Sequence, residues 1–250
     1  MSYSTKVRAT RWAVILAAVA ALEILPRAGL GDAITLIPLS EILPELFTML
    51  ASGEMTPHLL ATGGAFVLSF VLAGVTGVPL GYLLWRYRPL KRTLDPYLTT
   101  YYAIPIFAFY PLLLAVLGFN IWPIVAISWA WAVVAVVLNT AIGFGEVPRV
   151  LVKVGQSMNL SRWQILSRIF FPASIPYVFT GLKLGMVYSL IGVIASEFVL
   201  STKGLGYLVS YNYTNFRTAT MYSAMFLILA LAILLNWALN STERRLHGHG

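Results

Sequence analysis

The chain has 250 residues, of which 59% are hydrophobic and 10% are charged, and its formal net charge is +8. Its mean hydropathy of +0.81 implies more apolar surface than a soluble core of this size can bury. The composition therefore excludes an ordinary soluble domain and indicates an integral membrane protein. The chain contains no cysteine, which excludes disulfides and thiolate metal sites.

Long apolar runs recur along the chain, and a run of about 20 helical residues is enough to cross the hydrocarbon core of a bilayer. The runs lack the alternation of β-barrel strands, so we expect helices. The predicted spans are residues 12–25, 59–85, 97–118, 122–144, 173–196 and 221–240. The sequence thus predicts an all-α polytopic membrane protein, with six transmembrane helices in a single transmembrane domain over residues 1–250.

The connection between the first two spans, residues 26–58, is acidic. Within it, residues 40–47 are typical of the start of an amphipathic helix, with Ser40 as N-cap and acidic side chains in the first turn. Such a helix would lie along the outer membrane surface. A partly ordered loop fits the same residues.

Lysine and arginine collect on one side of the predicted spans. That side holds 13 of the 17 basic residues, in four groups: 6–11, 86–92, 149–168 and 244–245. Because basic loops stay in the cytoplasm, we expect both termini and the loop of residues 146–172 to be cytoplasmic. Basic loops that face anionic lipid account for the net charge, so we expect no nucleic-acid partner.

The spans carry few ionisable residues. Lys183 is expected to extend back to the cytoplasmic surface, and Glu23 and Glu197 are expected to reach water at the outer ends of their spans. A carrier driven by an ion needs ionisable groups within the membrane, so this scarcity disfavours one. The chain also has no GxxxxGK[ST] phosphate-binding loop, so an ATPase that drove transport would be another polypeptide.

Small residues recur at helical spacing in two spans, at Gly74, Gly77 and Gly81 and again at Gly181 and Gly185. Such faces allow two membrane helices to approach closely, and they also permit bending. We expect helix packing rather than a hinge.

Residues 149–172 interrupt the apolar pattern with four basic side chains and an amphipathic distribution. Taken alone, the segment suits two structures equally. It could lie in the lipid interface with its apolar face in the bilayer, or it could dock onto a partner.

An ordered set of short motifs resembles the membrane subunits of binding-protein-dependent ABC importers, most of all the nitrate/sulfonate/taurine/bicarbonate branch. The resemblance covers about residues 56–246. The motifs, in chain order, are Leu94-Asp95-Pro96, Ala103-Ile104-Pro105, Pro111-Leu112, Leu138-Asn139-Thr140, Ser161-Arg162-Trp163, Pro172-Ala173-x-x-Pro176, Thr180-Gly181-Leu182-Lys183 and Gly204-Leu205-Gly206-Tyr207.

This resemblance implies a type I ABC importer permease fold, in which the loop of residues 146–172 carries a coupling helix that docks on an ATP-binding subunit. The family's Glu-Ala-Ala is replaced here by Lys153-Val154-Gly155, and the family's glycine by Asn159. Asparagine is the residue besides glycine that best tolerates positive φ, so we expect a turn there. The expected docking residues are Met158, Asn159, Leu160, Ser161 and Arg162.

The resemblance also implies the partners of the chain. They are ABC ATPase subunits that hold ATP and Mg²⁺, an external solute-binding protein, a second permease subunit in a homodimer or heterodimer, and membrane lipid. No catalytic residue, cofactor or metal site is expected on this chain. The expected location is the bacterial inner membrane, and the expected cargo is a small oxyanion, a sulfonate or a related organic acid.

Aromatic and polar residues of the third to fifth spans are candidates for the translocation pathway or the outer gate. They are Tyr101, Tyr102, Trp129, Trp131, Asn139, Tyr188 and Glu197. Two alternative functions remain open at this point, an ion-coupled secondary carrier and a membrane scaffold that transports nothing.

Overall fold

The structure is a computed structural model, and it describes residues 3–29, 36–101 and 103–247. Every regular element in these ranges is helical. In chain order they are α1 (Tyr3–Arg27), α2 (Leu39–Ala51), α3 (Thr56–Arg86), α4 (Arg88–Tyr101), the 3₁₀ turn η1 (Ile106–Phe109), α5 (Tyr110–Leu117), α6 (Trp122–Gly145), α7 (Arg149–Ser157), α8 (Arg162–Ile165), the π-helical turn η2 (Leu166–Phe170), α9 (Phe171–Leu200), α10 (Leu205–Thr214) and α11 (Thr218–His247).

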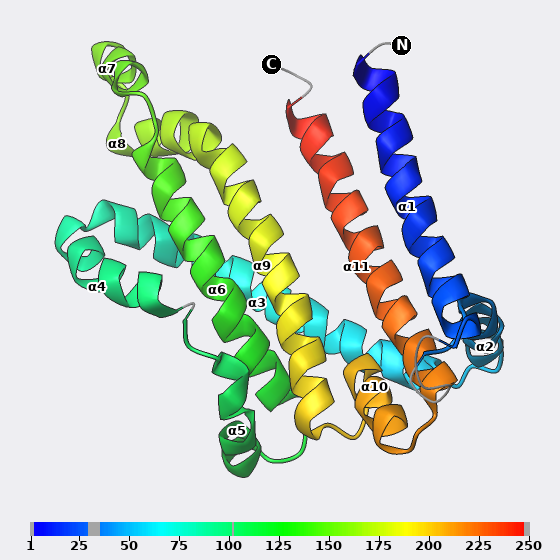
Figure 1. The fold of residues 1–250 in the computed structure, drawn as a ribbon. Coiled ribbons are helices and arrows are strands. Elements are labelled where there is room, and N and C mark those ends of the chain that lie inside the picture. Colours follow the sequence, from blue (N-terminus) through cyan, green and yellow to red (C-terminus); the bar gives the residue numbers. More distant parts are fainter. Residues whose placement is uncertain (1–2, 30–35, 102, 248–250) are drawn as a thin grey trace.

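Helix α6 is the centre of the bundle, with α3 and α9 packed along it (Figure 1). Glycines make both contacts close. A Cβ atom added to Gly77 of α3 would lie 2.7 Å from the Val136 Cβ, and one added to Gly185 of α9 would lie 2.9 Å from the Val136 Cγ2. Side chains on these faces would push the helices apart, so the two glycine series serve helix packing, as predicted.

Five helical segments in the described ranges are long and apolar enough to span a membrane, or six if one bent pair counts as a single span. The bent pair is the predicted third span. Instead of one continuous helix over residues 97–118, the chain forms α4 and then residues 106–117, at 86° to each other. Pro105 lies at the break, and a proline restricts the residue before it to extended conformations and cannot donate its own backbone hydrogen bond.

The elements divide between two ends of the bundle. Both termini lie at the same end as α7 and α8, whereas α2, α5 and α10 lie at the other end (Figure 1). We call the first the elbow end and the second the opposite end. This grouping matches the one predicted from the basic residues, in which both termini and residues 146–172 share a side.

Helix α2 forms where an amphipathic helix was predicted, but Ser40 is not its N-cap. The helix begins at Leu39 after Pro38, which makes no side-chain cap. Ser40 instead donates its backbone N–H and its hydroxyl to the Glu23 carboxylate of α1, at 3.0 and 2.9 Å. Glu23 also pairs with Arg27 at 2.6 Å, so a carboxylate from the neighbouring helix satisfies the start of α2.

Candidate functional site

The segment of residues 149–170 folds into an elbow, two short helices and a π-helical turn at one end of α6 and α9 (Figure 1). The turn after α7 is closed by two backbone bonds, from Leu160 N–H to the Gly155 carbonyl at 3.1 Å and from Asn159 N–H to the Gln156 carbonyl at 2.9 Å. This is a Schellman motif, whose C′ residue requires positive φ. Asn159 takes that position with φ 55°, so the predicted turn conformation is confirmed.

The second half of the elbow is closed by side chains. Ser161 is the N-cap of α8, and it makes a reciprocal capping box with Gln164. The Gln164 N–H donates to the Ser161 hydroxyl at 3.2 Å, and the Ser161 N–H donates to Gln164 Oε1 at 2.8 Å. Each closure satisfies backbone groups that would otherwise be unpaired at a helix end, so the elbow is held in one conformation.

The two arms of the elbow pack on each other at Gly155. A Cβ atom at this buried residue would lie 2.5 Å from the Ile169 Cδ1 and 3.4 Å from the Leu160 Cδ1. Glycine therefore lets α7 lie directly on the turn that leads into α9. Alignment of Lys153-Val154-Gly155 with the family's Glu-Ala-Ala did not predict the contact that Gly155 makes.

Several apolar side chains of the elbow are exposed. Met158 and Trp163 expose 69% and 73% of their surfaces, and Val150, Leu151 and Val154 are also exposed. Basic Lys153 and Arg162 flank them and are exposed too. A rigid surface of this kind, apolar with a basic rim, is typical of a site that binds a protein or a membrane surface.

Aromatic rings connect the elbow to the long helices. The Phe170 ring lies 4.8 Å from the Trp85 ring of α3, measured between centroids, and the Trp85 ring lies 5.3 Å from the Phe144 ring of α6. A displacement of the elbow would therefore press directly on α3, α6 and the start of α9, because packed aromatic side chains cannot be compressed.

The pathway candidates do not form one cluster. Trp131 of α6 and Tyr188 of α9 stack, with ring centroids 5.8 Å apart and planes 16° apart, and Phe107 adds a third ring 6.2 Å from Trp131. All three keep exposed surface, so this aromatic surface is the part of the predicted pathway that the fold brings together. Phe107 was missed because it lies on the 3₁₀ turn that replaces a predicted helix.

The other aromatic and amide candidates serve helix contacts. Trp129 Nε1 donates to the Thr76 hydroxyl of α3 at 3.0 Å, and the Tyr101 hydroxyl donates to the Ala130 carbonyl at 2.8 Å. Asn139 donates to the Ala135 carbonyl at 2.9 Å within its own helix. Tyr102 lies outside the described residues.

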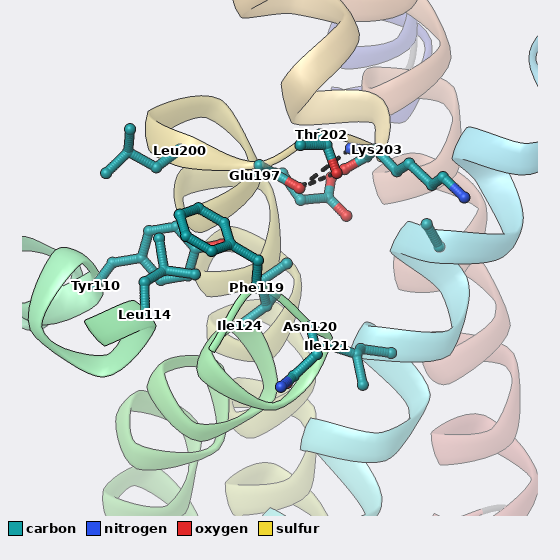
Figure 2. Close-up of a pocket in the computed structure, with 12 residues that line it drawn as sticks. Tyr110, Leu114, Phe119, Asn120, Ile121, Ile124, Glu197, Leu200, Thr202 and Lys203 are labelled. Carbon is teal, nitrogen blue, oxygen red and sulfur yellow. Dashed lines mark hydrogen bonds between the residues drawn. The ribbon is translucent and has the colours of Figure 1, made fainter. Parts of the chain in front are cut away.

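The prediction that Glu197 reaches water at the outer end of its span is wrong, because its carboxylate is buried. The residue is 1% exposed and lies at the opposite end of α9 (Figure 2). The Thr62 hydroxyl of α3 is 2.9 Å from both carboxylate oxygens, and the Gly206 N–H donates to Oε2 at 3.0 Å. Since Thr62 also accepts the Leu205 N–H at 2.8 Å, one carboxylate joins α9, α3 and α10.

Two glycines make room for this carboxylate. A Cβ atom at Gly204 would overlap the Glu197 carboxyl group, and one at Gly206 would overlap the Ile194 carbonyl. Gly204 also has φ 114°, which side chains rarely adopt. Beside this network lies a cavity of about 290 Å³ between Glu197, Tyr110 and Phe119. The Lys203 ammonium points away from the carboxylate (Figure 2).

Residues 73–248 match the family described as the inner membrane component of binding-protein-dependent transport systems. The match covers well over half of the chain. The chain belongs to this family. The permease is therefore a membrane component of an ABC importer rather than an enzyme, and the two alternative functions are not favoured.

Curated relatives of the permease agree with the predicted branch. It is 25% identical to the taurine transport system permease TauC of Escherichia coli K12, over 84% of this chain and 78% of that protein. It is 28% identical to the nitrate import permease NrtB of a Synechocystis strain, over 68% of this chain and 62% of that protein. The resemblance to the nitrate/sulfonate/taurine branch is confirmed.

A solved structure supports the fold. The inward-facing MetNI methionine ABC transporter superposes with a TM-score of 0.67 at 17% identity, covering 77% of this chain and 95% of that one. At this identity the similarity concerns the fold alone. It confirms the prediction of an all-α type I ABC importer permease.

Lys183 of the permease has a partner that the sequence did not indicate. Its side chain is half-buried, and its ammonium group donates to the Asn240 side-chain oxygen of α11. Asn240 lies near the end of α11 that is at the elbow end of the bundle (Figure 1), so this contact is compatible with the predicted extension toward that surface, which stays a prediction. The hydrogen bond to a neighbouring helix also satisfies the ammonium group.

Proposed function

We propose that separate ATP-binding subunits power this permease and that one of them binds the elbow from the cytoplasm. The residues that it contacts are Met158, Asn159, Leu160, Ser161 and Arg162. The observation that carries the proposal is a rigid elbow whose apolar side chains face outward at the base of α9. In this arrangement ATP and Mg²⁺ are held by the partner ATPase, and this chain holds neither.

The elbow is stiff enough to transmit a force. The Schellman motif, the capping box and the Gly155 contact leave the elbow little freedom to yield when a partner moves. Its motion then passes through the Trp85 and Phe170 rings into α3 and through η2 into α9. Coupling between distant sites requires a connected element of this kind, which responds as a unit.

The remaining partners follow from membership in the family. Residues 1–250 form one permease domain that pairs with a second permease subunit, and the two enclose a pathway that receives solute from an external binding protein. We place the surface of Phe107, Trp131 and Tyr188 on that pathway and Glu197 at its outer gate. The similarity to nitrate and taurine permeases supports a small oxyanion, sulfonate or related organic acid as cargo.

Co-purification tests the docking surface. Replacement of residues 158–162 by Gly/Ser is expected to abolish recovery of the ATPase subunit with the permease, because the apolar side chains of Met158 and Leu160 and the charge of Arg162 are lost. Met158→Ser is a milder variant that keeps the Schellman turn and is expected to lower recovery severalfold. Phe119→Ser is the matched control, since Phe119 is 82% exposed at the opposite end.

Unchanged recovery of the ATPase from a folded 158–162 variant would contradict the docking proposal, and so would equal losses for Met158→Ser and Phe119→Ser. The thermal unfolding midpoint of each variant shows whether it is folded.

A further inference from the structure

A cleft separates the last turns of α3 from the elbow. Its volume is about 540 Å³. Its lining includes Trp85 and Arg86 from α3, Gln156 from α7, Arg162 and Trp163 from α8, and Phe170 from η2. We call this space the α3–elbow cleft.

The lining of the α3–elbow cleft has two chemical parts. Trp85, Trp163 and Phe170 provide aromatic walls, and Arg86 and Arg162 provide two guanidinium groups. Guanidinium groups bind phosphate through paired hydrogen bonds. The cleft thus suits a ligand with an anionic group and an apolar body.

The two arginines have no carboxylate partner in the described part of the protein. No acidic residue lines the cleft. The Arg27–Glu23 ion pair lies at the opposite end of the bundle and involves neither arginine of the cleft. Between residues 82 and 170 the sequence has just two acidic residues, Asp95 and Glu146. Both guanidinium groups are exposed and are therefore available to an anion from outside this chain.

The position of the cleft favours one class of anion. Arg86 is the final residue of α3, a helix apolar enough to span the membrane, so it marks the level where hydrocarbon gives way to headgroups. Tryptophan is enriched at that level. We propose that the α3–elbow cleft binds an anionic phospholipid, with its phosphate on Arg86 and Arg162 and its glycerol and upper acyl chains against Trp85 and Phe170.

A bound lipid would touch both sides of the contact that links the elbow to α3. It would hold the elbow against α3 and would make the stability of the elbow depend on the composition of the membrane. A free phosphate ion would use the two arginines but leave the aromatic walls uncovered, and a polar ATPase side chain would do the same. The apolar half of the cleft therefore favours lipid over both.

The test measures lipid binding to the purified full-length permease by native mass spectrometry. The probes are phosphatidylglycerol and phosphatidylcholine with identical acyl chains. The unmodified protein is expected to prefer phosphatidylglycerol, and Arg86→Gln/Arg162→Gln to weaken its binding by at least about tenfold, because two charge-assisted hydrogen-bonding groups are removed. Arg168→Gln is the matched control, since Arg168 is an exposed elbow arginine outside the cleft. We expect its effect to stay within about twofold.

Four outcomes would overturn the proposal. They are equal binding of the two lipids, an equal loss in Arg168→Gln, displacement of phosphatidylglycerol by inorganic phosphate at matching concentration, and a double variant that keeps its lipid but loses the ATPase. Folding is checked by thermal unfolding in phosphatidylcholine. If the double variant does not fold, Arg86→Gln alone serves, because Arg86 is exposed and lies outside the proposed ATPase-docking residues.

Discussion

At the scale of single residues, Glu197 shows how one buried side chain can organise a turn. Its carboxylate accepts hydrogen bonds from α3 and α10. The Thr62 hydroxyl that donates to it also accepts a hydrogen bond from the Leu205 N–H. The Thr62 hydroxyl has one proton, so it donates to only one of the two carboxylate oxygens at a time. The network ties the 201–206 turn to the start of α3, 135 residues away in sequence from Glu197.

Glu197→Ala is expected to lower the free energy of unfolding by about 2–4 kcal/mol, because the Thr62 hydroxyl and the Gly206 N–H lose their acceptor in a buried place. The measurement is the thermal unfolding midpoint of the purified permease. Glu54→Ala is the control, as Glu54 is exposed and belongs to the turn just before α3. Equal midpoints for the two variants would show that the carboxylate network adds no stability.

At the scale of helices, the spacing of glycines determines how close α3 and α9 approach α6. Gly81 of α3 faces the Thr140 Cβ of α6, and a Cβ atom added there would lie 2.7 Å from the Val137 carbonyl oxygen. A backbone atom cannot move aside as a side chain can. Gly63 lies on the same helix, and a Cβ atom added to it would meet no neighbouring element within 4 Å.

The pair Gly81→Ala and Gly63→Ala therefore separates packing from helix propensity. Gly81→Ala is expected to destabilise the bundle by about 1–3 kcal/mol through overpacking. Gly63→Ala is expected to be neutral or to stabilise by up to about 1 kcal/mol, since alanine restricts the unfolded chain. Thermal unfolding of the two variants checks this. A stabilising Gly81→Ala would mean that α3 and α6 are not in contact at this point.

The sequence predicted where helices and turns form better than it predicted which helices contact one another. The positive φ of Asn159 could be predicted, because the resemblance places the family's glycine at this position and asparagine tolerates positive φ. The start of α2 was misjudged at Ser40 because its acceptor, Glu23, comes from another helix. The break at Pro105 was missed since the apolar run of residues 97–118 reads as continuous in composition.

At the scale of the whole molecule, the arrangement predicts a sidedness. The elbow and both termini share one end of the bundle (Figure 1), and the basic residues predict that this end is cytoplasmic. The chain has no cysteine, so each introduced thiol is unique. Met158 and Tyr213 are exposed at opposite ends, at 69% and 68%.

In intact cells stripped of any outer membrane, a membrane-impermeant maleimide is expected to label Tyr213→Cys. Met158→Cys is expected to react only after the membrane is permeabilised. The cysteine-free protein is the control for background labelling. The reverse pattern would place the elbow outside the cytoplasm, and the proposed docking of an ATPase there would then fail.

The sequence by itself determined the membrane class, the family, the sites of the long helices and the elbow between α6 and α9. The membrane class and the helix sites depend on composition and on runs of apolar residues, whereas the family and the elbow were predicted from ordered motifs that resemble those of known permeases. Tertiary structure alone decided that Glu197 joins Thr62, that Trp131 stacks on Tyr188 and that the α3–elbow cleft exists. Helices that are apolar on all sides carry no pattern to orient them, so their facing residues are selected only when they pack.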